Sequence, residues 1–302
     1  MLAKMKIGIL TYHASHNYGA FLQAYALSHI LKDRTEHCIE IIDFSMKKAE
    51  KVNRNIIWFN KRHIWPIPYN ISRYRMFKKA LKKYQLLSCE HLRTDDLQEF
   101  MNWISSLNYD AIIVGSDEIW KLDGYRGFPN PYWLPDITGI KKLSYAASSR
   151  THPSILTNNM KLNLLKFLDS FSYIGVRDQV TKKLLESILQ GRRKCNINCD
   201  PTFAYEFSET ERSSGFRNNS ENKTKKCIAL MIGIPELAYK IIKRYKHRFT
   251  FISLYNFYEG TVGYRAYDPF EWIDVIAKCD GLVTTFYHGM VFALKYDTPF
   301  MT

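Results

Sequence analysis

The chain has 302 residues, of which 46% are hydrophobic and 15% are aromatic, and its formal net charge at pH 7 is +14. This composition excludes a wholly disordered chain and supplies enough apolar material for one large domain or two ordinary ones. The N-terminal run MLAKMKIGIL is too short for a signal peptide, and no run approaches the roughly 18 residues of a membrane-spanning helix, so we expect a soluble cytoplasmic protein.

From the N-terminus, short apolar runs alternate with helical patterns. KIGIL predicts a buried strand at 6–10, apolar residues at helical spacing predict a helix within 19–32, and CIEIIDF predicts a strand at 38–44. A strand, a loop, a helix and a strand in this order open a parallel α/β sheet. The alternation continues with predicted strands at 110–117, 141–148, 173–178 and within 195–204, and with helices at 155–171 and 179–189.

The positive charge is concentrated between Lys47 and Arg93. This segment has 13 Lys and Arg residues and two acidic residues, which gives a local charge of +11. This segment reads as a basic helical insertion, in which MFKKALKKYQLL places its lysines opposite an apolar face that includes Phe77 and Leu81. A solvated helix face is one interpretation. Contact with an anionic membrane surface, or with a lipid-linked substrate lying on it, is another. Nucleic acid is disfavoured, because no recognition motif accompanies the charge.

A polar stretch at 206–226 has no apolar periodicity and predicts a linker. Beyond it the alternation resumes, with predicted strands at 227–233, 249–256 and 281–286 and helices over 236–245 and within 269–280. We therefore expect two α/β domains, over 1–205 and 227–302, with the active site in a cleft between them. In such sheets, ligands bind on the loops at the carboxyl ends of the strands.

The first such loop, at 11–20, carries His13, His16, Asn17 and Gly19 between a strand end and a helix start. Imidazoles beside the free N–H groups of a helix N-terminus suit an anion or a hydroxyl group. The other interpretation is that Asn17 only caps the helix. The loop lacks GxGxxG, which argues against a dinucleotide fingerprint.

Later strand ends supply further candidates. Ser116 and Asp117 lie at the C-terminal end of the strand predicted at 110–117, where they could cap a helix, orient a sugar hydroxyl or act as a base. Arg150 and His152 follow the strand predicted at 141–148, and Arg177 lies at the end of the strand predicted at 173–178. A guanidinium group binds carboxylate or phosphate through two hydrogen bonds, so arginines at this edge favour an anionic ligand over surface ion pairing.

His288 and Gly289 lie where the apolar run GLVTTF meets the helical pattern GMVFALKY. A histidine at the first turn of a helix faces a cleft together with the helix amides. A core histidine is the alternative, but the adjacent glycine removes a side chain where another group must approach.

Six segments together resemble the polysaccharide pyruvyl transferase family: KIGILTYHASHNYGAFLQAYAL, DAIIVGSDEIW, KKLSYAASS, GVRD, CDPTFA and LVTTFYHGMVFALKYDTPF. The resemblance extends from one end of the chain to the other. It implies two Rossmann-like domains in a GT-B-like arrangement. It also implies transfer of a pyruvyl group from phosphoenolpyruvate to two hydroxyls of a sugar, which gives a cyclic ketal.

By this resemblance, Arg177 and His288 match the donor-binding Arg and His of the family, with His288 at the phosphate and a candidate general acid. Asp117 or His13 would lie near the saccharide acceptor, which the basic segment suggests is lipid-linked. Arg150 and His152 have no counterpart in the motifs and follow from the residues alone. The scheme needs no metal and no cofactor besides phosphoenolpyruvate as donor. The alternatives are a nucleotide-sugar glycosyltransferase of the same fold and an inactive homologue.

Two further expectations concern cysteines and the end of the chain. The six cysteines are scattered, so we expect reduced thiols, and Cys195 and Cys199 have no second pair with which to form a zinc site. Pro299 to Thr302 read as the start of a strand. Because members of the resembled family continue past this point, we expect the second domain to be incomplete.

Overall fold

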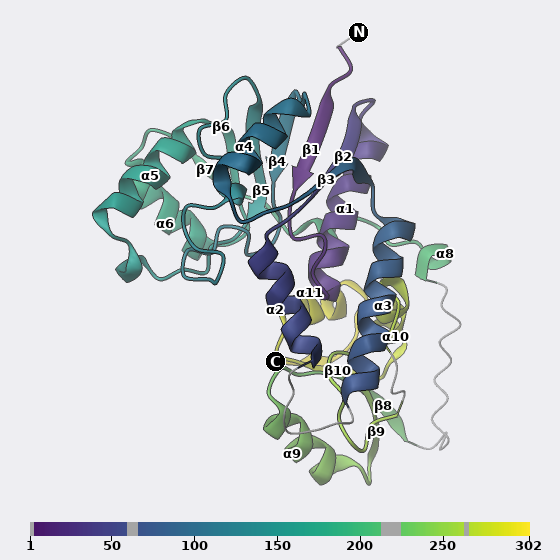
Figure 1. Ribbon diagram of the computed structural model, residues 1–302. Helices are drawn as coiled ribbons and strands as arrows, with labels where there is room; N and C mark the ends of the chain where they lie inside the picture. The colour runs from purple at the N-terminus through teal and green to yellow at the C-terminus, as the bar shows by residue number, and fades with distance from the viewer. Residues whose placement is uncertain (1–2, 59–65, 213–224, 263–265) are drawn as a thin grey trace. The chain divides into compact units, whose positions relative to one another are not determined.

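The computed structural model describes residues 3–58, 66–212, 225–262 and 266–302 (Figure 1). Its strands form two separate sheets, and every strand pair is parallel. The prediction of a parallel α/β protein is therefore confirmed. The chain separates into two compact units, the first of residues 1–15, 20–54 and 84–205 and the second of residues 16–19, 55–83 and 206–302.

The sheet of the first unit has seven strands in the order β3-β2-β1-β4-β5-β6-β7. Ile9 of β1 lies opposite Ile41 of β2 and Ile113 of β4, so β1 is hydrogen-bonded on both sides. The strands are β1 (Lys6–Leu10), β2 (Cys38–Ser45), β3 (Leu87–Arg93), β4 (Ala111–Val114), β5 (Lys141–Ala147), β6 (Phe171–Val176) and β7 (Cys195–Ile197).

Helices cover both faces of this sheet. Ile7 and Ile9 pack against Ala24 and Leu27 of α1 on one face, whereas Leu10 joins the cluster formed with α4, α5 and α6 on the other. Burial on both faces explains why the central strands are almost continuously apolar. The helical segments of this region are α1 (Tyr18–Arg34), α2 (Lys47–Trp58), α4 (Leu97–Ser106), η1 (Pro131–Trp133), η2 (Pro153–Ile155), α5 (Asn158–Asp169), α6 (Gln179–Leu189) and α7 (Pro201–Ala204).

The sheet of the second unit has four strands in the order β11-β10-β8-β9. Its core includes Leu230, Ile242 and Phe251, which are buried together with Tyr258. The elements are α3 (Pro66–Tyr84), α8 (Glu209–Arg212), β8 (Lys226–Met231), α9 (Pro235–Tyr245), β9 (Phe249–Ser253), α10 (Pro269–Lys278), β10 (Gly281–Thr284), α11 (Tyr287–Lys295) and β11 (Phe300–Met301).

Strand β3 was not predicted. It lies at the edge of the first sheet and, among the residues that the structure describes, pairs with β2 alone. Its sequence, LSCEHLR, includes Cys89, Glu90 and His91, which are exposed. An edge strand with one solvated face does not need the apolar run that reveals a central strand.

The predicted linker and basic segment look different in the structure. Residues 206–212 of the linker pack within the second unit, where Phe207 is 3% exposed and contacts Phe270 and Phe292. Residues 55–83 group with the second unit, although the prediction assigned all of 47–93 to the first domain. Residues 213–224 of the predicted linker and 59–65 of the basic segment lie outside the described residues.

The amphipathic character of α3 agrees with the sequence pattern. Phe77 and Ala80 are buried, and the Phe77 ring lies 4.9 Å from the Tyr18 ring. Lys78, Lys79, Lys82 and Lys83 are exposed. Within the described part of the chain, no helix is both long and apolar enough to cross a membrane.

Candidate functional site

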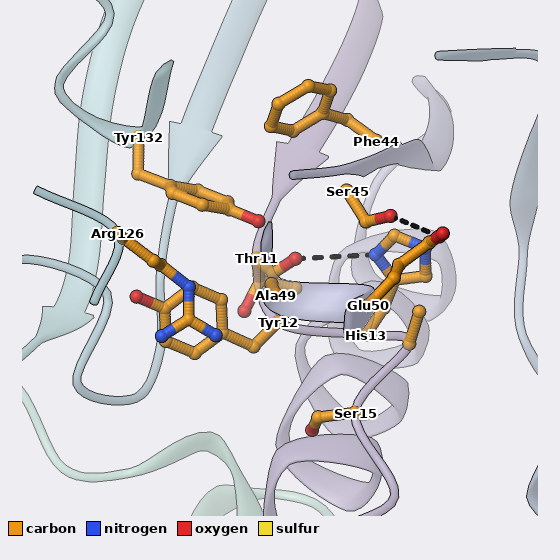
Figure 2. A pocket seen from close by; sticks show the side chains of 11 residues that line it. Thr11, Tyr12, His13, Ser15, Phe44, Ser45, Ala49, Glu50, Arg126 and Tyr132 are labelled. Atoms are coloured by element: carbon orange, nitrogen blue, oxygen red, sulfur yellow. Dashed lines mark hydrogen bonds between the residues drawn. The ribbon is translucent and has the colours of Figure 1, made fainter. Parts of the chain in front are cut away.

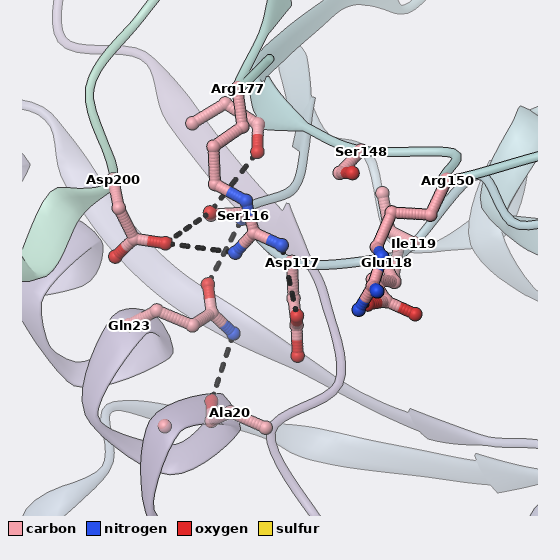
Figure 3. Close-up of polar contacts among 12 residues, drawn as sticks. Ala20, Gln23, Ser116, Asp117, Glu118, Ile119, Ser148, Arg150, Arg177 and Asp200 are labelled. Carbon is pink, nitrogen blue, oxygen red and sulfur yellow. Dashed lines mark hydrogen bonds and ion pairs between the residues drawn. The ribbon is translucent and has the colours of Figure 1, made fainter. Parts of the chain in front are cut away.

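Polar side chains meet at the carboxyl edge of the first sheet (Figure 3). Ser116 and Asp117 follow β4, Arg177 follows β6, and Asp200 follows β7. Because these strands are parallel, their carboxyl ends share one edge of the sheet, as predicted from the sequence. The structure thus brings together three of the predicted residues, Ser116, Asp117 and Arg177.

Arg177 is held between two carboxylates. Its Nη1 lies 3.0 Å from Oδ2 of Asp200, and its Nη2 lies 3.6 Å from Oδ1 of Asp117. The side chains of Arg177 and Asp200 are 7% and 0% exposed. A buried charge is costly unless an opposite charge compensates it. The ion pair with Asp200 therefore holds the Arg177 guanidinium group in place. Asp117, at 19% exposure, lies at the solvated side of this cluster.

Ser116 is buried, and its polar atoms bond within the protein. Its Oγ lies 3.1 Å from the carbonyl oxygen of Ala146 and 3.3 Å from Oδ2 of Asp200. Its N–H donates to Oε1 of Gln23 at 3.0 Å, and Nε2 of Gln23 donates to Thr11 Oγ1 at 2.9 Å. These bonds connect α1 to the ends of β1 and β4, so Ser116 contributes to the scaffold of the cluster.

Asp117 has a left-handed backbone, with φ of 82°. This conformation is costly for most residues, but Asp tolerates it better than others. Its carbonyl oxygen accepts a hydrogen bond of 2.8 Å from the Ser148 N–H, which ties the turn to the end of β5. The turn directs the carboxylate toward Arg177 (Figure 3).

Arg150 and His152 have local partners. Arg150 Nη1 donates to Glu118 Oε1 at 2.8 Å, and the Arg150 side chain is 68% exposed. His152 Nδ1 accepts from the Ser154 N–H at 3.2 Å and thereby caps η2. The Arg150 contact matches the ion-pair interpretation, and the capping role of His152 was not predicted. The role of either residue in substrate binding stays a prediction.

His13 is buried, and both ring nitrogens have partners. Nδ1 lies 3.3 Å from the Thr11 carbonyl oxygen, and Nε2 lies 3.1 Å from Oδ1 of Asp43, which Arg93 also contacts. Burial alone would raise the pKa of Asp43, but the hydrogen bonds and charges of His13 and Arg93 lower it to about 2. The His13 ring also lines a pocket at the carboxyl end of β1 (Figure 2).

The second unit brings Gly19 and His288 together. A Cβ atom on Gly19 would lie 2.0 Å from Nδ1 and 2.3 Å from Cγ of His288, far inside contact distance. His288 is 8% exposed and lies in the first turn of α11, as the sequence predicted. The group for which Gly19 makes room is thus the imidazole itself. Two motifs about 270 residues apart in the sequence form one contact.

Asn17 and Gly289 have structural contacts as well. Asn17 Oδ1 accepts from the Gly19 N–H at 2.9 Å, which is the capping interaction considered from the sequence. A Cβ atom on Gly289 would lie 2.3 Å from Thr284 Oγ1 and 2.9 Å from Met231 Sδ. Gly289 therefore lets α11 pack closely on the second sheet, and this packing fixes the position of His288 relative to that sheet.

An aromatic group in the second unit supports this contact. Tyr18 precedes Gly19, stacks on Trp272 with ring centroids 5.1 Å apart, and donates from its hydroxyl to the Tyr267 carbonyl oxygen at 2.9 Å. Burial raises the pKa of Tyr18 well above its ordinary value, so the hydroxyl remains a hydrogen-bond donor. This packing holds the start of α1 where His288 meets it.

His16, in the same segment, gives the protein a predicted pH dependence. Burial and the nearby Arg73 guanidinium lower its pKa from 6.5 to about 4. Between pH 6.5 and 4, His16 binds more protons in the unfolded chain than in the folded one. The free energy of unfolding is therefore highest above about pH 6.5 and decreases as pH falls toward 4. Urea unfolding between pH 7 and 4.5 should show this loss. His16→Gln should flatten the slope; a variant that keeps the native slope would contradict the assignment.

Asp200 and Gln23 were not singled out from the sequence. Asp200 also caps α7, because its Oδ1 accepts from the Thr202 N–H at 3.1 Å. A capping Asp before a proline is common, so the sequence did not distinguish it from a site residue. Its position after a short strand was the signal available. Among the described residues, no group of three or more His, Cys, Asp or Glu side chains is arranged to hold a metal ion.

Comparison with known proteins gives one family and a set of structural neighbours. The family model for polysaccharide pyruvyl transferase matches residues 17–302. Among curated proteins, no sequence matches significantly.

Three similar solved structures show the fold. A candidate UDP-N-acetylglucosamine 2-epimerase from Listeria monocytogenes has a TM-score of 0.56 at 10% identity, over 99% of this chain and 78% of that one. S. aureus MnaA, solved with UDP, has a TM-score of 0.55 at 9% identity, over 99% and 79%. UDP-GlcNAc 2-epimerase from Neisseria meningitidis, bound to UDP-GlcNAc, has a TM-score of 0.50 at 9% identity, over 94% and 78%. These proteins have GT-B-like folds, in agreement with the expected fold class, and identity this low shows the fold alone.

Proposed function

The chain belongs to the polysaccharide pyruvyl transferase family and is a transferase, and from this premise we propose that it moves a pyruvyl group from phosphoenolpyruvate to two hydroxyls of a saccharide. The observation that supports the proposal most strongly is the family match over residues 17–302. The close approach of Gly19 and His288 supports the residue assignment, because it brings into contact two motifs that the resemblance singled out.

The proposed reaction balances without a metal or a redox partner. A general acid protonates the methylene carbon of phosphoenolpyruvate, and an oxocarbenium-like centre develops at the carbon that bears the phosphate. One sugar hydroxyl adds to this carbon and the phosphate leaves. The second hydroxyl then closes the ketal ring, and its proton leaves with the phosphate. The protein must therefore supply an acid, a base and cationic groups for the phosphate.

We assign these roles to residues at the two sites. His288 contacts the donor phosphate and acts as the general acid, with its ring position set by Gly19. Arg177 binds the anionic donor, and its 3.6 Å separation from Asp117 is long enough for a donor carboxylate to take the place of that residue. Asp117, which is partly exposed, or His13 relieves the sugar hydroxyl of its proton.

A nucleotide-sugar glycosyltransferase is the alternative, because the structural neighbours from S. aureus and N. meningitidis hold UDP and UDP-GlcNAc. A ligand that binds only the folded protein raises its melting temperature, by the equivalent of about 2.7 kcal/mol at a concentration of 100 Kd. We expect phosphoenolpyruvate to raise the melting temperature and UDP-GlcNAc to leave it unchanged. The reverse pattern would favour the alternative.

We further propose that the acceptor is lipid-linked and that α3 contacts an anionic membrane surface. Each lysine near such a surface contributes roughly 1 kcal/mol, so exchanging Lys78, Lys79, Lys82 and Lys83 for Gln should weaken binding to phosphatidylglycerol vesicles by at least about tenfold. Lys240, Lys243 and Lys246 are also exposed and serve as the matched control. Vesicle binding that is equal in both variants would exclude this contact.

A further inference from the structure

A small pocket of the first unit lies at the carboxyl end of β1 and includes His13, Ser15, Ser45, Glu50 and Arg126 in its lining (Figure 2). Its volume is about 30 Å³. One water molecule needs roughly 10–15 Å³ on this measure, so the pocket has room for one small polyatomic group and not for a sugar ring.

Arg126, which lines this pocket, lies over two tyrosine rings, and one of them, Tyr12, lines the pocket as well. Its guanidinium carbon is 3.8 Å from the centroid of the Tyr12 ring and 4.5 Å from that of the Tyr125 ring. Stacking of this kind holds the guanidinium plane and leaves its N–H groups directed outward. Arg126 has no hydrogen bond or ion pair with any residue that the structure describes, and its Nε is buried without an acceptor.

The loop that carries Arg126 is held in place by its own hydrogen bonds. The Gly127 N–H donates to the Gly124 carbonyl oxygen at 3.0 Å, and Gly127 has a φ of 74°, which closes a turn. Asn130, which is 2% exposed, donates from Nδ2 to the Gly127 carbonyl oxygen at 2.6 Å. The guanidinium group is thus preorganised and not carried on an unanchored chain.

The acidic group of the pocket is already neutralised by another cation. Glu50 Oε1 lies 2.9 Å from Nε of Arg93 and 2.6 Å from Oγ of Ser45. Ser15 Oγ, which lines the same pocket, is buried without a hydrogen-bond partner among the described residues. The pocket therefore combines an unneutralised cation with a hydroxyl donor, and leaving such buried donors unsatisfied is costly.

We propose that this pocket binds a single oxyanion, a phosphate or a carboxylate, through Arg126 and Ser15. The planar guanidinium group matches the two oxygens of such an anion. Naming the source of the anion rests on the proposed function: it is either the phosphoenolpyruvate donor or a phosphate on the saccharide acceptor. The site itself does not depend on that function.

The test measures the affinity of the protein for inorganic phosphate by calorimetry. Charge-assisted hydrogen bonds of this kind are worth about tenfold or more in affinity, so Arg126→Gln should raise the Kd for phosphate by at least about tenfold. Arg126→Lys, which keeps the charge and loses the planar fork, should raise it less. Arg192→Gln removes an exposed guanidinium of the same unit and is the control, with an unchanged Kd. A native protein that does not bind phosphate, or an Arg126→Gln variant that folds and keeps the native Kd, would overturn the proposal. If Arg126→Gln does not fold, the same comparison with Arg126→Lys decides it, and a native Kd in that variant likewise overturns the proposal.

Competition identifies the source of the anion. Displacement of phosphate from the Arg126-dependent site by phosphoenolpyruvate alone supports the donor, and displacement by glucose 1-phosphate alone supports a phosphorylated acceptor. If phosphate binding depends on Arg126 but the protein shows no pyruvyl transfer, the anion site stands and the proposed function is wrong. If the protein transfers pyruvyl groups but its phosphate binding does not depend on Arg126, the proposed function stands and the anion site is wrong.

Discussion

Replacing Gly19 with alanine should lower the free energy of unfolding by about 1–3 kcal/mol, the usual cost of forcing extra volume into a packed site. The reason is the His288 ring, whose Nδ1 would lie 2.0 Å from the new methyl group. Helix propensity alone predicts the opposite sign, since alanine in a helix is favoured over glycine by about 1 kcal/mol. Gly19 lies in the first turn of α1, so this test separates packing from propensity.

The matched control is Gly124→Ala, because the nearest atoms to a Cβ at that position are side-chain carbons of Lys121 at 3.8 Å. It should leave the free energy of unfolding within about 0.5 kcal/mol of native. Adding His288→Ala to Gly19→Ala should recover part of the lost stability, because it removes Nδ1 and Cγ, the two atoms nearest to the new methyl group, and leaves Cβ of His288 at 2.8 Å. Urea denaturation of five proteins, the native chain, Gly19→Ala, His288→Ala, their double variant and Gly124→Ala, measures these expectations. Additive effects of the Gly19 and His288 substitutions would contradict the contact.

Replacing Asp200 with asparagine should destabilise the first unit by about 3 kcal/mol, the low end of the cost of breaking a buried ion pair, because Asp117 remains 3.6 Å from the Arg177 guanidinium group. Arg177 is 7% exposed and would lose the 3.0 Å ion pair that compensates its charge. Asn keeps the shape of the side chain and its cap on α7, so the loss reports the charge and not the volume. The double variant Arg177→Met with Asp200→Asn should be more stable than Asp200→Asn alone.

An exposed pair of the same unit provides the comparison. Arg192 and Asp169 lie 3.4 Å apart, with side chains 60% and 37% exposed. A pair of this kind contributes between 0 and about 1 kcal/mol, so Asp169→Asn should change little. Urea denaturation distinguishes the two cases, and an Asp200→Asn variant as stable as Asp169→Asn would show that Arg177 does not depend on its partner.

The sequence predicted the central strands well, and for a physical reason. Strands buried on both faces are mostly apolar, so β1 (KIGIL) and β8 (KCIALM) stand out in the sequence, and β2 (CIEIIDFS) is recognisable from its three isoleucines. The edge strand β3 is solvated and mixed in composition, so its pattern resembles a loop. Likewise, residues 206–212 look like a linker, because the single buried residue Phe207 gives no periodicity.

The position of the site could be predicted from the sequence, but the residues that contact Arg177 and Gly19 could not. The rule that ligands bind at the carboxyl ends of strands pointed to Ser116, Asp117 and Arg177. It succeeded because the strands are parallel, so their carboxyl ends lie at one edge of the sheet. The carboxylate that fixes Arg177 comes from Asp200, which lies 23 residues further along the chain, and no local pattern reports such a contact. The meeting of Gly19 with His288 is of the same kind.

The central claim is pyruvyl transfer, and the most direct measurement is acceptor-dependent phosphate release from phosphoenolpyruvate, followed with mass spectrometry of the saccharide product. With a competent acceptor from a panel of sugars and lipid-linked saccharides, we predict one phosphate released for each ketal formed. Removing a general acid typically costs 10²–10⁴-fold in rate, so His288→Ala should lose at least about 100-fold, and Gly124→Ala should retain native activity. Transfer of a sugar from a nucleotide donor to these acceptors, with phosphoenolpyruvate left unconsumed, would contradict the account.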